Sequence, residues 1–224
     1  MGEVAGVHRM KNRVQILRTR LSNCYVVEAE SGVVLIDAGA PGDADNILSV
    51  IGDRRLNLIL ITHAHFDHYG SAAEIRRRTG APIAIHEADA ENMHRAKTHL
   101  GIVKGRGKIA AAFLPLVERF YDPEPTEADV HLHGGEDLGS YGLDASVVHT
   151  PGHTIGSCSL IYGENAAFVG DLLSNTGGAH LQRYFAMDWP ALIPSLEKVK
   201  QYRPARIYAG HGKRAMNREE LEGL

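Results

Sequence analysis

The chain has 224 residues, of which 44% are hydrophobic, and its formal net charge is -3. This size fits one large domain with ample residues for a buried core, and the nearly balanced charge provides no global field that would attract nucleic acid. Its two cysteines, Cys24 and Cys158, form no C-x-x-C pair, so we expect no disulfide framework and a reduced, cytoplasmic setting. The first residues lack the apolar core of a signal peptide, and no stretch reaches the roughly 20 apolar residues of a membrane span.

The first half of the chain alternates apolar strands with short helices. Strands are predicted over four apolar stretches, residues 23–29, 33–37, 56–61 and 82–86. Helices are predicted over residues 43–51 and 70–79, and the second of these ends at Gly80. From residue 87 to residue 121 the pattern is helical, with an interruption at residues 104–108.

The second half repeats the strand pattern. Strands are predicted over four short apolar stretches, residues 145–149, 157–162, 166–169 and 206–209. A last long helix is predicted to begin near Asp188 with Pro190 in its first turn. Its apolar stripe comprises Leu192, Ile193, Leu196 and Val199. Strands in both halves with helices around them predict a layered α/β sandwich.

A run of histidines directly follows the predicted strand 56–61. His63, His65 and His68 lie close together with Asp67 between the last two. In an extended chain His63, His65 and Asp67 point to the same side, whereas His68 falls out of this phase. One segment can therefore serve two adjacent cations, and its imidazole and carboxylate groups favour zinc or iron over calcium.

Three more candidate ligands follow strands that are predicted in the second half. His153, Asp171 and His211 each come after an apolar strand, and each has a neighbouring glycine that permits a tight turn. A catalytic zinc ion needs about three protein ligands and an open position for water, so two ions need about six ligands. The coincidence of these residues at strand ends predicts a two-metal site.

With its H-x-H-x-D-H motif and these strand-end residues, the chain resembles the metallo-β-lactamase-fold hydrolase superfamily from about residue 23 to residue 211. The resemblance implies a four-layer αββα sandwich, with residues 1–224 as a single domain that carries a helical cap at about 88–121. It implies two divalent metal ions, zinc first and iron or manganese as alternatives. The implied ligands are His63, His65 and His153 for one ion, and Asp67, His68 and His211 for the other, with Asp171 bridging both.

The same resemblance implies two further roles and a subtype. Asp37 matches a position that orients a ligand imidazole from outside the metal shell. Asp67 is expected to be catalytic, because it can orient the attacking water and carry its proton. Many true β-lactamases of this fold place a cysteine where this chain has Asp171. The aspartate favours the thioesterase, lactonase and phosphodiesterase branches.

The substrate is expected to be a small molecule, with no nucleic acid or membrane as partner. Apolar residues of segment 88–120 line a pocket, form a homodimer contact or simply pack two helices against the core, and these alternatives stay open. Lys104, Arg106 and Lys108 either meet an anionic substrate tail or are simply solvated. Three residues that follow Asp171 are expected to border the pocket, namely His180, Arg183 and Tyr184.

Several functions are compatible with these residues. The leading one is hydrolysis of an ester or thioester in the manner of glyoxalase II, although only a short stretch follows His211 in place of that enzyme's C-terminal domain. A lactonase is a close alternative, but Ser174 stands where acyl-homoserine lactonases carry a tyrosine. A phosphodiesterase, a persulfide dioxygenase with a single iron, and a non-catalytic protein on a decayed site are the remaining alternatives.

Overall fold

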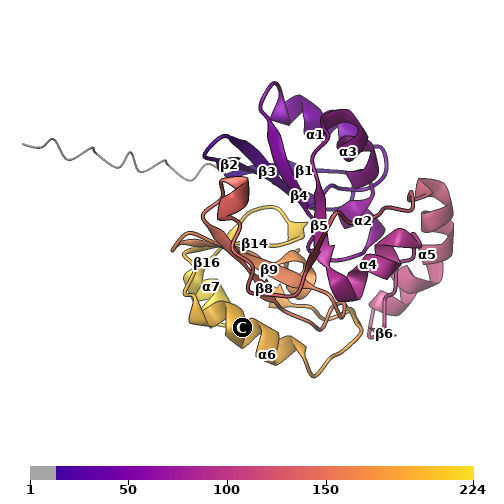
Figure 1. Cartoon of the computed structure of the whole chain (residues 1–224). Helices are drawn as coiled ribbons and strands as arrows, with labels where there is room; N and C mark the ends of the chain where they lie inside the picture. The colour runs from indigo at the N-terminus through magenta and orange to yellow at the C-terminus, as the bar shows by residue number, and fades with distance from the viewer. Residues whose placement is uncertain (1–13) are drawn as a thin grey trace, which may run out of the picture.

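The computed structural model describes residues 14–224 and has four layers, with two β-sheets facing each other and helices on their outer faces (Figure 1). This arrangement confirms the predicted αββα sandwich. The expectation about a signal peptide concerns the first residues of the chain, which lie outside the described residues.

The first sheet has six strands in the order β1-β2-β3-β4-β5-β7. Their bounds are β1 (Val14–Arg18), β2 (Asn23–Ala29), β3 (Gly32–Ile36), β4 (Leu56–Leu60), β5 (Ile83–His86) and β7 (Val130–Leu132). From β3 to β7 neighbouring strands run parallel, so their carboxyl ends lie at one edge of the sheet. The inner strands are mostly apolar, with Asn57 of β4 as a polar exception, because both faces of the sheet are covered.

The second sheet has five strands in the order β16-β14-β10-β9-β8. Their bounds are β8 (Ala145–His149), β9 (Cys158–Tyr162), β10 (Ala166–Phe168), β14 (Arg206–Tyr208) and β16 (Met216–Asn217). Strands β10 and β14 are parallel neighbours. Two smaller sheets join β11 (Leu173–Asn175) with β12 (His180–Leu181) and β15 (His211–Gly212), and β6 (Ile102–Val103) with β13 (Phe185–Ala186).

The helices form the outer layers and one side of the molecule (Figure 1). Helices α1 (Ala44–Ile51) and α3 (Ala72–Thr79) cover the first sheet, whereas α6 (Leu192–Gln201) and α7 (Arg218–Glu222) cover the second. Helices α4 (Glu87–His94) and α5 (Gly107–Tyr121) lie at the side, and the short α2 (Phe66–Tyr69) follows the histidine run. Two 3₁₀ turns span Gly139–Tyr141 and Gly170–Leu172.

Three buried apolar clusters hold the four layers together. Ile47 of α1 lies in the cluster between the first sheet and its helices. Val34 and Phe168 lie in the cluster between the two sheets, and Leu196 and Ile207 lie in the one under α6. Each such side chain contributes about 1.5–3 kcal/mol when fully buried, so the two sheets are fixed firmly enough to hold loops at their edge in place.

Two predicted helices begin or continue differently in the structure. The last long helix begins at Leu192 rather than near Asp188, because the Asp188 carboxylate accepts a hydrogen bond from Ala191 N (3.2 Å) and closes a turn there. Ile193, which was assigned to the buried stripe, is exposed. The helical pattern after residue 87 breaks at His94, and residues 102–103 form a strand that pairs with β13.

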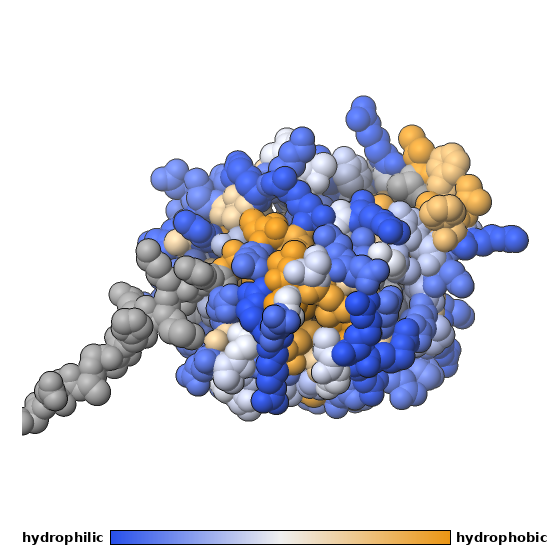
Figure 2. All heavy atoms as spheres, turned by 90° about the horizontal axis from the view of Figure 1, so that it is seen from above, coloured by the Kyte–Doolittle hydropathy of each residue, from blue (hydrophilic) through white to orange (hydrophobic). Residues whose placement is uncertain are grey.

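Helix α5 presents an apolar face to the outside. Its exposed side chains recur every three or four residues and are Ile109, Phe113, Leu116 and Phe120, the last of which is 82% exposed. Figure 2 shows this apolar group at the edge of the molecule over α5. Leu114 and Val117 on its other face pack against the core. These two residues show the ordinary core packing that was one of the alternatives, whereas a pocket or a homodimer contact at the outward face stays a prediction.

Within residues 14–224, no helix has the length and apolar character needed to cross a membrane.

Candidate metal centre

The carboxyl ends of strands from both sheets meet at one edge of the sandwich. Asp37 follows β3, and His63 lies shortly after β4. Asp171 follows β10 in the same way, and His211 follows β14. Since β3 is parallel to β4 and β10 to β14, the pairing brings these polar residues to a common place.

Backbone contacts between the two halves fix this edge. Cys158 N donates to Thr62 O at 2.9 Å, and Asn23 N donates to Gly210 O at 2.8 Å. At Gly210 a Cβ would lie 2.2 Å from the Asp171 carboxylate, so only glycine permits the close approach. Because Gly210 has no side chain, the backbone of the second half can lie directly against the predicted site.

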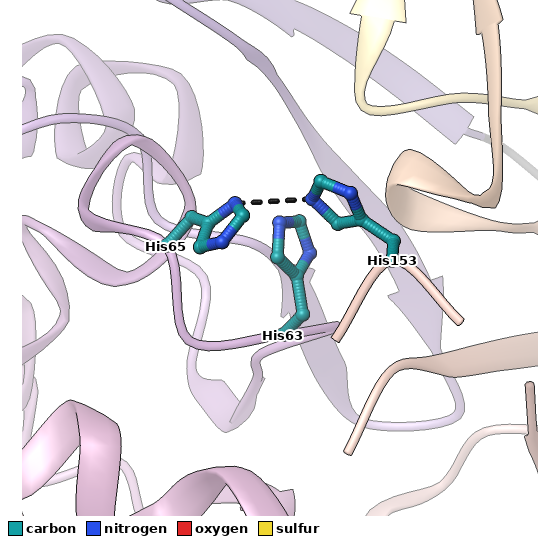
Figure 3. Close-up of side chains that lie close together, drawn as sticks. All are labelled: His63, His65 and His153. Carbon is teal, nitrogen blue, oxygen red and sulfur yellow. Dashed lines mark hydrogen bonds between the residues drawn. The ribbon is translucent and has the colours of Figure 1, made fainter. Parts of the chain in front are cut away.

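The structure brings all seven predicted ligands together. Three overlapping groups have ligand atoms within 4.8 Å of one another: His63, His65 and His153; His63, His68 and Asp171; and Asp67, His68 and His211. Figure 3 shows the rings of the first group turned toward one another, with His63 and His65 coming from one segment and His153 from the other half.

Asp37 orients the His68 ring from outside. Its Oδ2 accepts hydrogen bonds from His68 Nδ1 (2.8 Å) and Thr62 Oγ1 (2.9 Å), and its Oδ1 accepts one from Thr62 N (2.8 Å). The carboxylate is almost completely buried and sits at a positive φ of 57°, a conformation that aspartate tolerates better than most residues. Because Nδ1 donates outward, Nε2 of His68 faces the inside of the site, where a metal ion can take the place of its proton.

Two other rings are held in the same way and fit a cation between them. His65 Nε2 lies 3.1 Å from the carbonyl oxygen of His99, and His153 Nδ1 lies 3.0 Å from that of Phe185. Carbonyl oxygens only accept hydrogen bonds, so these nitrogens carry the protons. The inner nitrogens, His65 Nδ1 and His153 Nε2, then point lone pairs at each other across 3.0 Å. A divalent cation satisfies both.

The remaining inner atoms fit the same interpretation. Within residues 14–224, the buried atoms His63 Nε2, His68 Nε2 and Asp171 Oδ1 have no hydrogen-bond partner. The Asp171 carboxylate lies 3.5 Å from His68 Nε2, 3.6 Å from His153 Nε2 and 3.2 Å from His211 Nε2. Buried polar atoms are costly unless they are paired, and imidazole with carboxylate donors suits zinc, iron or manganese.

Burial keeps part of the cluster neutral. It lowers the pKa of His63 well below its ordinary value, and the neighbouring histidines lower it further. The pKa of His153 falls to about 3 through burial and the proximity of His65. Neutral imidazole is the form that binds a metal ion, so these rings are prepared as ligands.

The carboxylates make the other part of the cluster attractive to positive charge. Burial alone would lower the pKa of His68, but Asp67, Asp37 and Asp171 together raise it to about 10. Burial also opposes the charge on His211, whose pKa is nevertheless raised to about 9 by Asp171 and Asp67. The site therefore stabilises positive charge, which protons or metal ions can supply.

Asp89 is a buried residue of α4 whose carboxylate joins the loop after β4, which carries His63 and His65, to the loop that carries His153. It was not predicted as a site residue. Its carboxylate accepts hydrogen bonds from Ala64 N (2.9 Å), Thr154 Oγ1 (2.7 Å) and Gly156 N (2.8 Å). One sequence signal points to it, because Asp89 is four residues before the buried Met93 and so shares the apolar face of that helix.

The predicted pocket residues lie on a segment that Gln182 holds against the site. Gln182 Oε1 accepts from the backbone N–H groups of Arg183 (2.9 Å) and Tyr184 (3.0 Å), while Nε2 donates to Asp171 O (3.3 Å). The Arg183 guanidinium lies 5.2 Å from the centre of the Tyr184 ring. His180 of β12 pairs with Ser174 of β11, and on its other side Ser174 pairs with His211 of β15. Gln182 itself was not predicted.

The family comparison decides the identity of this arrangement. The model of the metallo-beta-lactamase superfamily matches residues 17–211. The chain belongs to this superfamily. The resemblance drawn from the H-x-H-x-D-H motif is thereby confirmed, together with a His/Asp cluster that can bind metal.

Relatives of this family cover most of the chain. The hydroxyacylglutathione hydrolase GloC of Haemophilus influenzae is 30% identical over 200 residues, which are 85% of this chain and 85% of that protein. The uncharacterized protein YobT of Bacillus subtilis is 31% identical over 205 residues, 85% of this chain and 83% of YobT. The probable metallo-hydrolase MJ0888 of Methanocaldococcus jannaschii is 27% identical, with coverage of 85% and 87%.

Solved structures agree with the fold. TTHA1623, whose crystal structure is in a di-iron-bound form, is 28% identical and superposes with a TM-score of 0.68 over 94% of this chain and 96% of that one. The B3 metallo-beta-lactamase BLEG-1 superposes with a TM-score of 0.68 at 24% identity, over 95% and 97% of the two chains. The second likeness concerns the fold alone.

Proposed function

We propose that this chain is a metal-dependent hydrolase that works with two divalent cations on an ester, thioester or lactone. The observation that carries the proposal is Asp171, whose carboxylate contacts rings of both predicted ligand sets at 3.2–3.6 Å. The relative GloC is named as a hydrolase of an acyl conjugate, which favours acyl substrates over phosphodiesters.

Each predicted residue has a role in this proposal. His63, His65 and His153 would hold one cation, Asp67, His68 and His211 the other, and Asp171 both. Two cations bound there would supply hydroxide from water near neutral pH and a Lewis acid for the acyl oxygen. Zinc suits this donor set, with iron or manganese as alternatives. Helices α4 and α5 would serve as a cap within one domain.

Asp67 is the proposed catalytic carboxylate. Its Oδ2 lies 3.5 Å from His211 Nε2 and 3.7 Å from His68 Nε2. Its side chain is 17% exposed, compared with 10% for Asp171 and 1% for Asp37, so it is the acid of the site that a substrate can reach most easily. It would accept a hydrogen bond from the attacking water, take its proton and return that proton to the leaving group.

Metal analysis with a substrate panel tests the proposal. We expect two divalent cations per chain and turnover of at least one thioester, ester or lactone, while phosphodiester and β-lactam substrates are turned over poorly. Removing the cations with a chelator should abolish turnover, and zinc should restore it. Bound cations favour the folded state, so chelation should also lower the melting temperature. The free energy of unfolding should fall by about 4 kcal/mol for an ion that was present at 1,000 times its Kd. One bound iron with oxygen uptake on a persulfide, and no hydrolysis, would overturn it.

The variant Asp37→Asn tests the orienting role of that carboxylate. Asparagine tolerates the positive φ, but its amide group replaces the oxygen that accepts from His68 Nδ1. We expect zinc affinity to fall about 10–100-fold, measured by competition with a chromogenic chelator. Asp43→Asn is the matched control, since Asp43 is also buried and contacts no histidine among residues 14–224. Equal affinity in Asp37→Asn and the wild-type protein would disprove this role.

A further inference from the structure

A cavity of about 800 Å³ opens beside the candidate metal centre, and His211 is one of its lining residues. The other lining residues come from three loops that are far apart in the sequence. They are residues 18–23, from the end of β1 to the start of β2, residues 175–178, from the end of β11 onward, and residues 212–214 after His211. A molecule seated in the cavity therefore contacts a predicted metal ligand directly.

The walls of this cavity are cationic. Four of its lining residues are basic, and no lining residue among those described is acidic; the basic ones are Arg18, Arg20, Lys213 and Arg214. Two of them have acidic partners outside the cavity. Arg20 Nε lies 3.6 Å from Asp43 Oδ1, and Arg214 binds both carboxylate oxygens of Glu220 at 2.7 and 2.6 Å.

Arg18 and Lys213 remain available to a ligand. The Arg18 guanidinium donates to the backbone carbonyl of Lys213, which holds the two residues next to each other. Within residues 14–224, neither side chain has a carboxylate within 4.0 Å. Two basic residues without an acidic partner on the wall of one cavity attract an anion.

We propose that this cavity binds a carboxylate on the substrate, with Arg18 and Lys213 as the residues that select it. The proposal rests on the hydrolase function given above and narrows its substrate to an anionic acyl compound. The planar guanidinium of Arg18 matches a carboxylate, and Lys213 adds a second charge. The acyl group of the same molecule then lies toward His211 and the metal centre.

Residues 104–108, the cap loop, are the alternative place for the anionic tail of a substrate. The first basic side chain of this loop, Lys104, already has a partner. Lys104 Nζ lies 3.8 Å from the centre of the Trp189 ring, and Trp189 Nε1 donates to Ile102 O at 2.9 Å. Lys104 therefore packs the cap loop against the segment before α6. Lys108, on the first turn of α5, is exposed, so its replacement tests this rival place directly.

Matched substrates measure the selection. We expect S-acetyl-3-mercaptopropionate to be hydrolysed with a kcat/KM about tenfold higher than that of its neutral amide. In Arg18→Gln/Lys213→Gln the value for the acid should fall about tenfold, while that for the amide stays constant, as two exposed contacts of this kind contribute a few-fold each. Lys108→Gln should behave like the wild-type protein. Raising the salt concentration from 0.01 to 0.5 M should shrink the preference, since exposed charges are screened.

A binding measurement separates this proposal from the hydrolase function. The thioether S-(2-oxopropyl)-3-mercaptopropionate resembles the acid but cannot be hydrolysed, and calorimetry gives its Kd and that of its amide. If no thioester, ester or lactone of the panel is turned over but the thioether acid binds about tenfold more tightly than its amide, and only the double variant loses this preference, the anion site stands and the hydrolase function falls. Equal turnover of acid and amide, unchanged in the double variant, would overturn the anion site and leave the hydrolase function intact.

Discussion

Replacing Asp67 with alanine is expected to lower kcat about 10³-fold while the protein stays folded. The substitution removes the carboxylate that is proposed to orient the attacking water and carry its proton, and general acid–base groups contribute about 10²–10⁴-fold. It also removes one predicted ligand of the second cation, near His68 and His211. Initial rates on a substrate that the wild-type protein hydrolyses, together with circular dichroism and metal content, measure the effect.

Asp45→Ala is the control for Asp67→Ala. Asp45 is an exposed acid of α1 that pairs with Arg78 on α3 and is not a predicted ligand. Its removal should leave kcat unchanged, because exposed ion pairs contribute little and this one touches no predicted ligand. Near-normal turnover by Asp67→Ala would show that the carboxylate has no catalytic role.

Replacing Asp89 with alanine is expected to lower the free energy of unfolding by about 3 kcal/mol. The change leaves the buried N–H groups of Ala64 and Gly156 and the hydroxyl of Thr154 without their acceptor, and each such loss costs about 1–3 kcal/mol. Urea unfolding of the metal-free protein measures this loss without the contribution of bound cations. Turnover should fall as well, because the loops that carry His65 and His153 lose their common anchor.

Two companion variants make the Asp89 result specific. Asp144→Ala removes an exposed aspartate before β8 and should change stability by no more than about 0.5 kcal/mol. Asp89→Asn keeps the shape but turns one acceptor into a donor, so its stability should lie between those of the alanine variant and the wild-type protein. If Asp89→Ala is as stable as the control, the carboxylate does not anchor the loops.

The sequence predicted well whatever depends on short-range pattern. The apolar run at Leu56–Leu60 indicated a buried strand, and the structure has β4 there. The seven residues that were predicted as ligands lie together in the structure, and they could be selected because they follow apolar stretches and because the H-x-H-x-D-H spacing is rare by chance. The fold class followed from the same alternation of strands and helices, together with the family resemblance.

What the sequence did not predict depends on contacts between distant segments. Asp89 binds backbone groups 25 and 67 residues away, and nothing in its neighbourhood signals those partners. The cationic cavity combines Arg18 with Lys213, which meet only when β1 packs near the end of the second sheet. The start of α6 was misplaced because Asp188 forms a turn with Ala191 instead of capping the helix.

The distance along the chain between His65 and His153 has a consequence for the unfolded state. The two rings are 88 residues apart in sequence and 3.0 Å apart in space. Both cysteines are buried and free, so no disulfide restricts the chain. A cation that stayed bound to both rings in the unfolded chain would act as a cross-link, and closing a loop of this length removes about 4–5 kcal/mol worth of chain entropy from the unfolded state. Such a bound metal ion would restrict the unfolded chain as a disulfide does, and reducing conditions would not break this link.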